Sequence, residues 1–299
     1  GYNKINLYGT SYGTRLAMAY INKFPNNVRT ATLKGLVPED LVIPVDFAKD
    51  SQEGLNMLIE KCKTDELCAS VFPNFEQEFY ALMNRSFPID AKIINPETQL
   101  EETVQLTKES IALTIRSLLS IPTYTQQIPF IVSEAYKGNY AVLAELILRI
   151  NMSSSKGIFT AMRLCVICYE DYPKIPETTE DPLDQTFLKD IWTNRIINAC
   201  KIWNPSRENA SRVHYNNHDI PVLLISGERD SATPPNYGDQ VVKYFKNGRH
   251  IVVTNSGHSF DRMLNCVEYM INDFVISGTA QDLDLDCLKS IEYPEFKLN

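Results

Sequence analysis

The chain has 299 residues, of which 44% are hydrophobic and 22% are charged, and its formal net charge is −8. A chain of this length can bury a sizeable core, either as one large domain or as two. The acidic balance argues against nucleic acid as a partner, which would need a basic surface, and no stretch approaches the run of about 18 apolar residues that a membrane-spanning helix requires.

The start of the chain has the pattern of a strand, a turn, a helix and a second strand. Residues 4–8 have a strand-like pattern with strand formers at Ile5, Leu7 and Tyr8, residues 9–13 form a glycine-bounded turn, and residues 14–24 carry apolar side chains at helical spacing. Pro25 ends the helix, and residues 28–33 form the next strand. This order predicts a parallel βαβ unit.

Residues 36–219 are dominated by helical periodicity, with Pro, Asn and Asp at the breaks. The expected helices cover residues 47–61, 75–85, 107–119, 126–137, 140–150, 156–170 and 184–202. One hairpin is expected at residues 92–106.

The α/β pattern returns near the end of the chain. Residues 221–226 are a continuous apolar run, as expected for a strand that is buried on both faces. A helix over 237–245, a strand over 250–254 and a helix over 261–276 follow.

The predicted fold class is therefore α/β, with one sheet that is interrupted by a large, mostly helical insertion. Residues 1–35 and 220–299 should form the sheet domain, and residues 36–219 the insertion.

Gly9-Thr10-Ser11-Tyr12-Gly13 fits the pattern G-x-S-x-G between the first strand and the first helix. In such a turn the glycines are expected where a Cβ would collide, and the serine is strained so that its hydroxyl projects above the sheet. The helix N-terminus favours a developing negative charge, and the Tyr12 N–H is placed as an oxyanion donor. A glycine-rich turn without chemistry is the alternative for this pattern alone.

A serine nucleophile needs a base, and a histidine base needs an acid to orient it. His258 follows the last predicted strand, and Asp230 follows the strand before it. Ligands of parallel sheets bind outside the carboxyl ends of the strands, where both side chains and Ser11 should meet. Glu228 and Asp239 are rival acids: Glu228 comes too early in the turn, and Asp239 lies within a predicted helix.

The other three histidines fit the role of base less well. His214 and His218 belong to a polar segment at the end of the insertion. His250 begins the predicted strand 250–254, so we expect it at the opposite edge of the sheet from the site.

The chain contains seven cysteines. Cys165 and Cys168 form a lone CxxC without a second ligand pair and within a helical pattern, so we expect no metal, and nothing in the sequence indicates a cofactor. An oxidising compartment is favoured, with one cysteine unpaired. The expected disulfides are Cys62–Cys68 across a short polar loop at 63–67, Cys168–Cys200 between two helices, and Cys266–Cys287 between the last helix and the tail. Cys165 could replace Cys168, and seven reduced thiols are the alternative.

Several motifs resemble those of one enzyme family. Residues 9–14, residues 227–230 with Thr233-Pro234, and Gly257-His258 are similar to motifs of the tripeptidyl aminopeptidase-like and proline iminopeptidase-like serine peptidases, which are α/β-hydrolases. The resemblance extends into the insertion at Cys168-Tyr169-Glu170-Asp171, Cys200-Lys201-Ile202-Trp203 and Cys287. It implies that the insertion is a helical cap over the active site and that the enzyme releases residues or short peptides from free N-termini.

Recognition of a free N-terminus requires a fixed carboxylate, because an ammonium group that leaves water needs a partner. The resemblance places an acidic residue of this cap segment near the active site. Glu170 is the first candidate and Asp171 the second, and a solvated carboxylate at a helix end is the alternative.

The resemblance also creates an expectation about the start of the protein. An α/β-hydrolase has several strands before the nucleophile, and this sequence has one. We therefore expect further N-terminal strands, which would carry the second oxyanion donor, and a signal peptide for a secreted or periplasmic protein.

Two other functions compete with the peptidase. One is an esterase or lipase acting on small acyl esters, which would need an apolar slot where a peptidase needs a carboxylate. The other is a non-catalytic relative that uses the fold for binding. An intact set of Ser11, Asp230 and His258 argues against the second.

Overall fold

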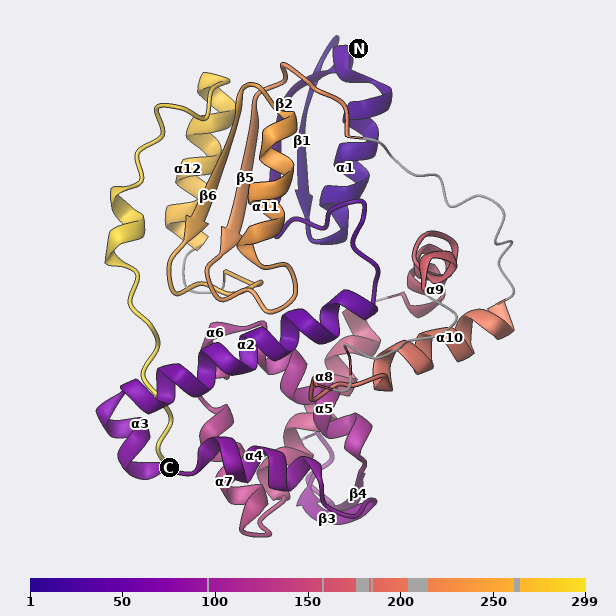
Figure 1. The fold of residues 1–299 in the computed structure, drawn as a ribbon, viewed down its shortest axis with the longest axis vertical. Coiled ribbons are helices and arrows are strands. Elements are labelled where there is room, and N and C mark those ends of the chain that lie inside the picture. The colour runs from indigo at the N-terminus through magenta and orange to yellow at the C-terminus, as the bar shows by residue number, and fades with distance from the viewer. Residues whose placement is uncertain (96, 158, 176–182, 184, 204–214, 261–263) are drawn as a thin grey trace. The chain divides into compact units, whose positions relative to one another are not determined.

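The computed structural model describes the chain except for residues 96, 158, 176–182, 184, 204–214 and 261–263. The described residues form two compact units, which are considered separately (Figure 1). The first unit consists of residues 1–41, 120–123 and 211–294. The second consists of residues 42–119, 124–210 and 295–299.

These units differ from the expected division at residues 35/36 and 219/220. The first boundary falls at residue 41, because the loop after the second strand is buried with the first unit. Residues 120–123 come from the middle of the predicted cap yet lie in the first unit. The tail at 295–299 lies in the second unit, where the Lys297 N–H donates to the Gln126 carbonyl over 3.2 Å.

The first unit is built on a four-stranded parallel sheet in the order β1-β2-β5-β6. The strands are β1 (Ile5–Thr10), β2 (Val28–Lys34), β5 (Val222–Gly227) and β6 (Gly248–Val253). Their order and direction confirm the predicted α/β class and the βαβ unit.

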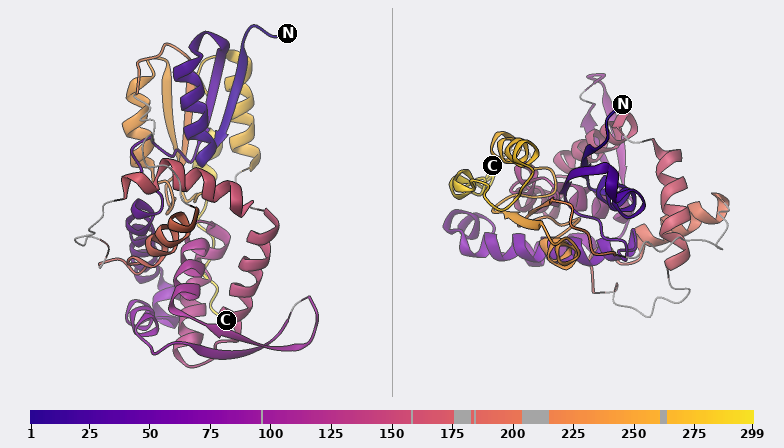
Figure 2. Two further views of the ribbon diagram at one scale, coloured as in Figure 1. Left: turned by 90° about the vertical axis from the view of Figure 1, so that its right-hand side faces the viewer. Right: turned by 90° about the horizontal axis from the view of Figure 1, so that it is seen from above.

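Apolar layers cover both faces of this sheet, as the run in β5 predicts. Leu224 packs in a cluster with residues of α1 (Tyr12–Lys23) and α11 (Pro235–Val241). Its neighbour Ile225 packs in the opposite cluster with α12 (Leu264–Ser277). Figure 2 shows α1 and α11 on one side of the sheet and α12 on the other. The two central strands, β2 and β5, are mostly buried, whereas β1 is largely exposed.

The second unit is mostly helical and contains the predicted hairpin, β3 (Ile89–Ile94) paired antiparallel with β4 (Glu101–Leu106). Its helices are α2 (Val45–Thr64), α3 (Glu66–Val71), α4 (Phe75–Met83), α5 (Lys108–Leu119), α7 (Ile128–Tyr136), α8 (Ala141–Gly157), α9 (Thr160–Glu170) and α10 (Ile191–Trp203). The short helix α6 (Pro122–Thr125) starts in the first unit and ends in the second.

Several boundaries differ from the sequence analysis; for example, α8 continues to Gly157, beyond the end expected at residue 150. The polar loop expected at 63–67 is wrong: α2 continues to Thr64, and Asp65 caps α3 by accepting the Cys68 N–H over 3.0 Å. Helix α10 begins at Ile191 rather than 184, after the left-handed residue Lys189 (φ 46°). The helix expected at 237–245 is α11 followed by a 3₁₀ turn, Val242–Tyr244.

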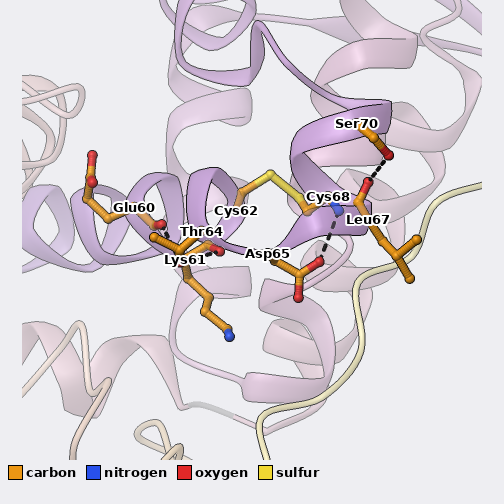
Figure 3. The surroundings of a disulfide bond; sticks show 8 residues. All are labelled: Glu60, Lys61, Cys62, Thr64, Asp65, Leu67, Cys68 and Ser70. Atoms are coloured by element: carbon orange, nitrogen blue, oxygen red, sulfur yellow. Dashed lines mark hydrogen bonds between the residues drawn. A yellow bond between two sulfur atoms is a disulfide. The ribbon is translucent and has the colours of Figure 1, made fainter.

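The structure contains the three expected disulfides, Cys62–Cys68, Cys168–Cys200 and Cys266–Cys287. They join α2 to α3 (Figure 3), α9 to α10, and α12 to the 3₁₀ helix η5 (Asp286–Ser290). Cys165 has a free, exposed thiol. Such crosslinks are characteristic of proteins that fold in oxidising compartments.

Within the described ranges, none of the helices has the length and apolar character needed to cross a membrane.

Candidate active site

Ser11 occupies the sharp turn between β1 and α1 and has a strained backbone, with φ 54° and ψ −125°. A non-glycine residue rarely adopts a positive φ, and such strain is concentrated at functional sites. A Cβ on Gly9 would lie 2.5 Å from the Gly13 carbonyl oxygen, so that glycine is required, as expected. The same expectation for Gly13 is wrong, because a Cβ there meets nothing within 4 Å among the described residues.

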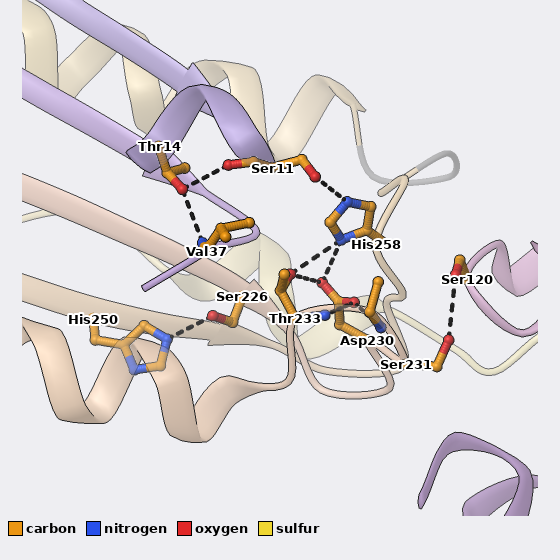
Figure 4. A network of polar contacts seen from close by, with 11 residues as sticks. Ser11, Thr14, Val37, Ser120, Ser226, Asp230, Ser231, Thr233, His250 and His258 are labelled. Atoms are coloured by element: carbon orange, nitrogen blue, oxygen red, sulfur yellow. Dashed lines mark hydrogen bonds and ion pairs between the residues drawn. The ribbon is translucent and has the colours of Figure 1, made fainter. Parts of the chain in front are cut away.

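The turn is fastened to the loop that follows β2. The Thr14 hydroxyl donates to the Ser11 carbonyl over 2.6 Å and accepts the Val37 N–H over 2.9 Å (Figure 4). The guanidinium of Arg15, only 4% exposed, donates to two carbonyls of the same loop over 3.1 and 2.8 Å. The sequence analysis missed both residues, although their position directly after the serine motif was the available signal.

His258 connects Ser11 to Asp230 in one chain of hydrogen bonds. Its Nε2 lies 3.0 Å from the Ser11 Oγ, and its Nδ1 lies 2.8 Å from the Asp230 Oδ2 (Figure 4). The structure thus brings together the three residues that the sequence analysis selected. These distances allow proton transfer from the serine to the imidazole.

Asp230 is 1% exposed, so its carboxylate depends on protein hydrogen-bond donors. Its Oδ1 accepts the backbone N–H groups of Ala232 and Thr233, each over 2.8 Å. Its Oδ2 accepts the Thr233 hydroxyl over 2.8 Å in addition to the imidazole. A buried charge with this many donors is fixed in one orientation.

Thr233 is a site residue that the sequence analysis did not assign. Its hydroxyl donates its single proton to Asp230, and its oxygen lies 3.1 Å from Nδ1 of His258, where it can accept the Nδ1–H. The available signal was the Thr-Pro pair that follows the acid in the sequence.

Gly35 closes the site on another side of the imidazole. It has a left-handed φ of 60°, and a Cβ there would lie 3.0 Å from Cε1 of His258. Both conformation and space therefore require glycine at the end of β2.

The rival acids have other partners. Glu228 is exposed and accepts the Asn255 N–H over 2.9 Å. Asp239 lies 2.8 Å from Nδ1 of His250. Neither of these hydrogen bonds involves the imidazole of His258.

His250 takes part in a second Ser–His–Asp arrangement. Its Nε2 lies 2.9 Å from the Ser226 Oγ (Figure 4), so Ser226, His250 and Asp239 are also linked. Ser226 is 1% exposed within β5, and the imidazole of His250 is 5% exposed. The expectation that His250 begins its strand at the opposite edge is wrong: it is the third residue of β6 and contacts Asp239 of α11.

His218 is held by an unrelated contact, with Nε2 2.8 Å from the Asn22 Oδ1. Burial lowers the pKa of its imidazole below the usual value. His214 lies outside the described residues.

The expected oxyanion donor, Tyr12, lies in the first unit, and the carboxylates expected to bind the substrate, Glu170 and Asp171, lie in the second. Tyr12 is the first residue of α1, and its ring lies 5.9 Å from the Arg15 guanidinium. In the second unit, the partly buried Glu170 ends α9, and the next residue, Asp171, is fully buried. The roles of these residues in catalysis and binding stay predictions.

In the part of the chain that the structure describes, no group of three or more His, Cys, Asp or Glu residues is arranged to hold a metal ion.

Residues 185–287 match a family model described as TAP-like protein. This segment includes Asp230 and His258. The chain is also 25% identical over 107 residues to the tripeptidyl aminopeptidases of Streptomyces lividans and of Streptomyces coelicolor. Each match covers 35% of this chain but only 20% and 19% of the respective relative, so the chain spans about a fifth of their length.

Among solved structures, the chain is similar to MGS-M2, an α/β-hydrolase from a deep-sea metagenome library, and to Est816, described as an N-acyl homoserine lactone degrading enzyme. The identities are 15% and 9%, with TM-scores of 0.34 and 0.36. The alignments cover 96% and 92% of this chain and 69% and 67% of the other. The family model and the two peptidases confirm the resemblance found in the motifs: this chain is similar to the TAP-like proteins.

Proposed function

We propose that this protein is a serine peptidase in which Ser11 is the nucleophile, His258 the general base and Asp230 the residue that orients the base. The single observation that carries the proposal is the unbroken hydrogen-bond chain through these side chains, which starts at a serine in a strained strand-to-helix turn. The similarity to proteins named tripeptidyl aminopeptidase supports a peptide substrate.

In the proposed reaction, the Ser11 Oγ attacks the scissile carbonyl while its proton passes to Nε2 of His258. Asp230 stabilises the imidazolium that forms. The carbonyl oxygen becomes an oxyanion, which accepts the Tyr12 N–H at the start of α1. The imidazolium then protonates the leaving amine, and water, activated by the same histidine, hydrolyses the acyl-enzyme.

We further propose that the substrates are peptides with a free N-terminus and that Glu170 binds their ammonium group, with Asp171 as the nearest competitor. The carboxylate of Glu170 is partly buried at the end of α9. The disulfide at Cys168, two residues earlier, fixes this end of the helix to α10. A carboxylate that is held in this way suits a cation that must leave water.

The disulfides also support a location in an oxidising compartment. We therefore propose that the protein is secreted or exported to a periplasm.

Two assays of the full-length protein test the reaction and the substrate class. A fluorophosphonate probe should label the wild type at Ser11 and should not label Ser11→Ala. A substrate panel of aminoacyl, dipeptidyl and tripeptidyl amides, with small acyl esters as a separate arm, should show turnover of the free-amine amides. Turnover of the esters alone would indicate an esterase, and absence of both labelling and turnover would refute the proposed function.

Glu170→Gln tests ammonium recognition with two substrates, one with a free amine and one with that amine acetylated. We expect kcat/KM to fall by roughly 10- to 100-fold on the free-amine substrate, the scale of a charge-assisted hydrogen bond. The acetylated substrate should be slow with both proteins. Glu145→Gln, which removes a surface carboxylate paired with Arg149, is the matched control. Equal losses on both substrates would exclude Glu170, and Asp171→Asn would then be assayed in the same way.

A further inference from the structure

The loop that carries His258 is held by a segment from the middle of the helical insertion. The Ser120 carbonyl accepts the backbone N–H of His258 over 3.0 Å and that of Ser259 over 3.4 Å. Ser120 begins the four-residue segment 120–123, which lies in the first unit, whereas the residues on both sides of it in the chain belong to the second.

The same segment also reaches the turn that carries the acid. The Ser120 Oγ lies 3.3 Å from the Ser231 Oγ (Figure 4). Ser231 directly follows Asp230 and is 1% exposed. One short segment therefore contacts both the loop of the proposed base and the turn of the proposed acid.

Close packing at Gly257 shows how tightly this segment is seated. A Cβ on Gly257 would lie 2.9 Å from the Ser120 carbonyl oxygen and 3.0 Å from the Pro122 Cδ. The first of these contacts is closer than real Cβ atoms adopt, and it is made with backbone, which cannot move aside as a flexible side chain can. The residue before His258 is thus a glycine because the segment 120–123 occupies the space.

The loop needs such external contacts, because its own backbone does not favour its conformation. Asn255 and Phe260, on either side of His258, have left-handed φ values of 53° and 55°. For residues other than glycine, this region of backbone conformation is energetically unfavourable. Hydrogen bonds and packing from outside the loop must therefore hold it in place.

We propose that residues 120–123 are a positioning element that sets the imidazole of His258 relative to Ser11. This proposal rests on the proposed function for its kinetic consequence. The segment contacts the loop backbone rather than the imidazole, so its residues are positioning residues. In this view the insertion does more than provide a substrate-binding cap, since it also completes the scaffold of the base.

Gly257→Ala is the most direct test in the full-length protein, because Gly257 has no left-handed φ and alanine changes mainly the contact with Ser120 and Pro122. We expect kcat to fall by about 10- to 100-fold, as for a small misplacement of a catalytic group. KM and the circular dichroism spectrum should stay close to those of the wild type. Ser120→Ala, which removes the link to Ser231, should give a smaller loss in the same direction.

Ser117→Ala is the matched control. The Ser117 hydroxyl donates to the Leu113 carbonyl within α5 over 2.9 Å, so its loss removes a helix contact and leaves segment 120–123 intact. We expect wild-type kcat for this variant.

A spectroscopic measurement separates this proposal from the proposed function. The proton on Nδ1 of His258 should give a downfield NMR signal, assigned by its absence in His258→Ala. The signal should shift in Gly257→Ala and Ser120→Ala and stay unchanged in Ser117→Ala. An inactive wild type with these shifts would refute the peptidase but support the positioning role. An unchanged signal in both Gly257→Ala and Ser120→Ala would overturn the positioning role, and Ser120→Ala alone decides if Gly257→Ala does not fold.

Discussion

Two hydrogen-bonded Ser–His–Asp networks, called chains here, lie on the same parallel sheet. They share residue types and hydrogen bonding, but they differ in the backbone around the serine and in the burial of the acid. In the first, Ser11 sits in a strained turn at the end of a strand, and the acid is buried. In the second, Ser226 is buried within β5, and Asp239 is 69% exposed at the surface of α11. The hydrogen-bond distances are nearly the same, 3.0 and 2.8 Å against 2.9 and 2.8 Å.

The comparison shows that hydrogen-bond geometry alone does not identify a nucleophile. A nucleophilic serine must also reach the substrate, and the oxyanion that forms from the substrate carbonyl must meet hydrogen-bond donors that are already in place. Ser11 precedes the N-terminus of α1, whereas Ser226 belongs to a strand whose whole length is buried. We therefore expect the second chain to stabilise the contact between β5, β6 and α11 and to have no part in turnover.

Replacing the two serines should give the largest difference in activity between the two Ser–His–Asp networks. We expect Ser11→Ala to lower kcat by about 10⁶-fold, since loss of a triad nucleophile has effects of this size. Ser226→Ala should leave kcat within about twofold of the wild type while lowering the free energy of unfolding by about 1–3 kcal/mol, because a buried imidazole nitrogen loses its partner. Steady-state kinetics and urea unfolding measure both effects. A large kinetic loss in Ser226→Ala would reverse the assignment.

Replacing the two acids should give the next largest contrast. Asp230→Asn should lower kcat by about 10⁴-fold, as loss of the orienting acid does in well-studied triads. Asp239→Asn removes only the negative charge of an exposed partner of His250 and should leave kcat unchanged. The kinetic assay is the same, and comparable losses in the two variants would show that the chains are not functionally distinct.

Thr233 provides a finer test, because its hydroxyl lies within hydrogen-bond distance of both Asp230 and His258. Thr233→Val keeps the shape but removes the donor to Asp230, so we expect kcat to fall by about 10- to 100-fold, the scale of a hydrogen bond to a charged group. Thr233→Ser restores the hydroxyl and should recover most of the activity. Failure of serine to rescue would mean that Thr233 acts through packing alone.

The smallest effect concerns His218, a histidine that belongs to neither Ser–His–Asp network. Burial lowers its pKa in the folded protein, so the unfolded chain takes up the proton first as the pH falls below about 6.5. This difference in pKa therefore has no effect on the free energy of unfolding at higher pH, and it lowers that free energy as the solution becomes acidic. His218→Gln keeps a donor for Asn22 and should show a smaller loss of thermal midpoint between pH 8 and pH 5 than the wild type. An identical pH dependence in both proteins would contradict this.

The sequence by itself determined the elements that depend on local pattern. The buried run 222–227, the strand–serine–helix turn and the helical spacing of α2, α5 and α9 all follow from side-chain periodicity and turn chemistry. The three residues of the proposed site were also predictable, because parallel strands bring their carboxyl ends to one edge. The cysteine pairs were also predicted correctly, although Cys68 and Cys287 lie outside every helix and strand that the sequence predicts.

Only the tertiary structure decided which polar groups support the site. The hydroxyl of Thr233, the carbonyl of Ser120 and the space left by Gly35 act on His258 from segments that are distant from it in the chain. Side-chain periodicity cannot predict such contacts. Every residue has the same backbone carbonyl, and a glycine in the sequence does not show which neighbour occupies the space beside it. The second chain through His250 was hidden for the same reason: its partners meet across β5, β6 and α11, and contacts between elements depend on packing rather than on the sequence of any one of them.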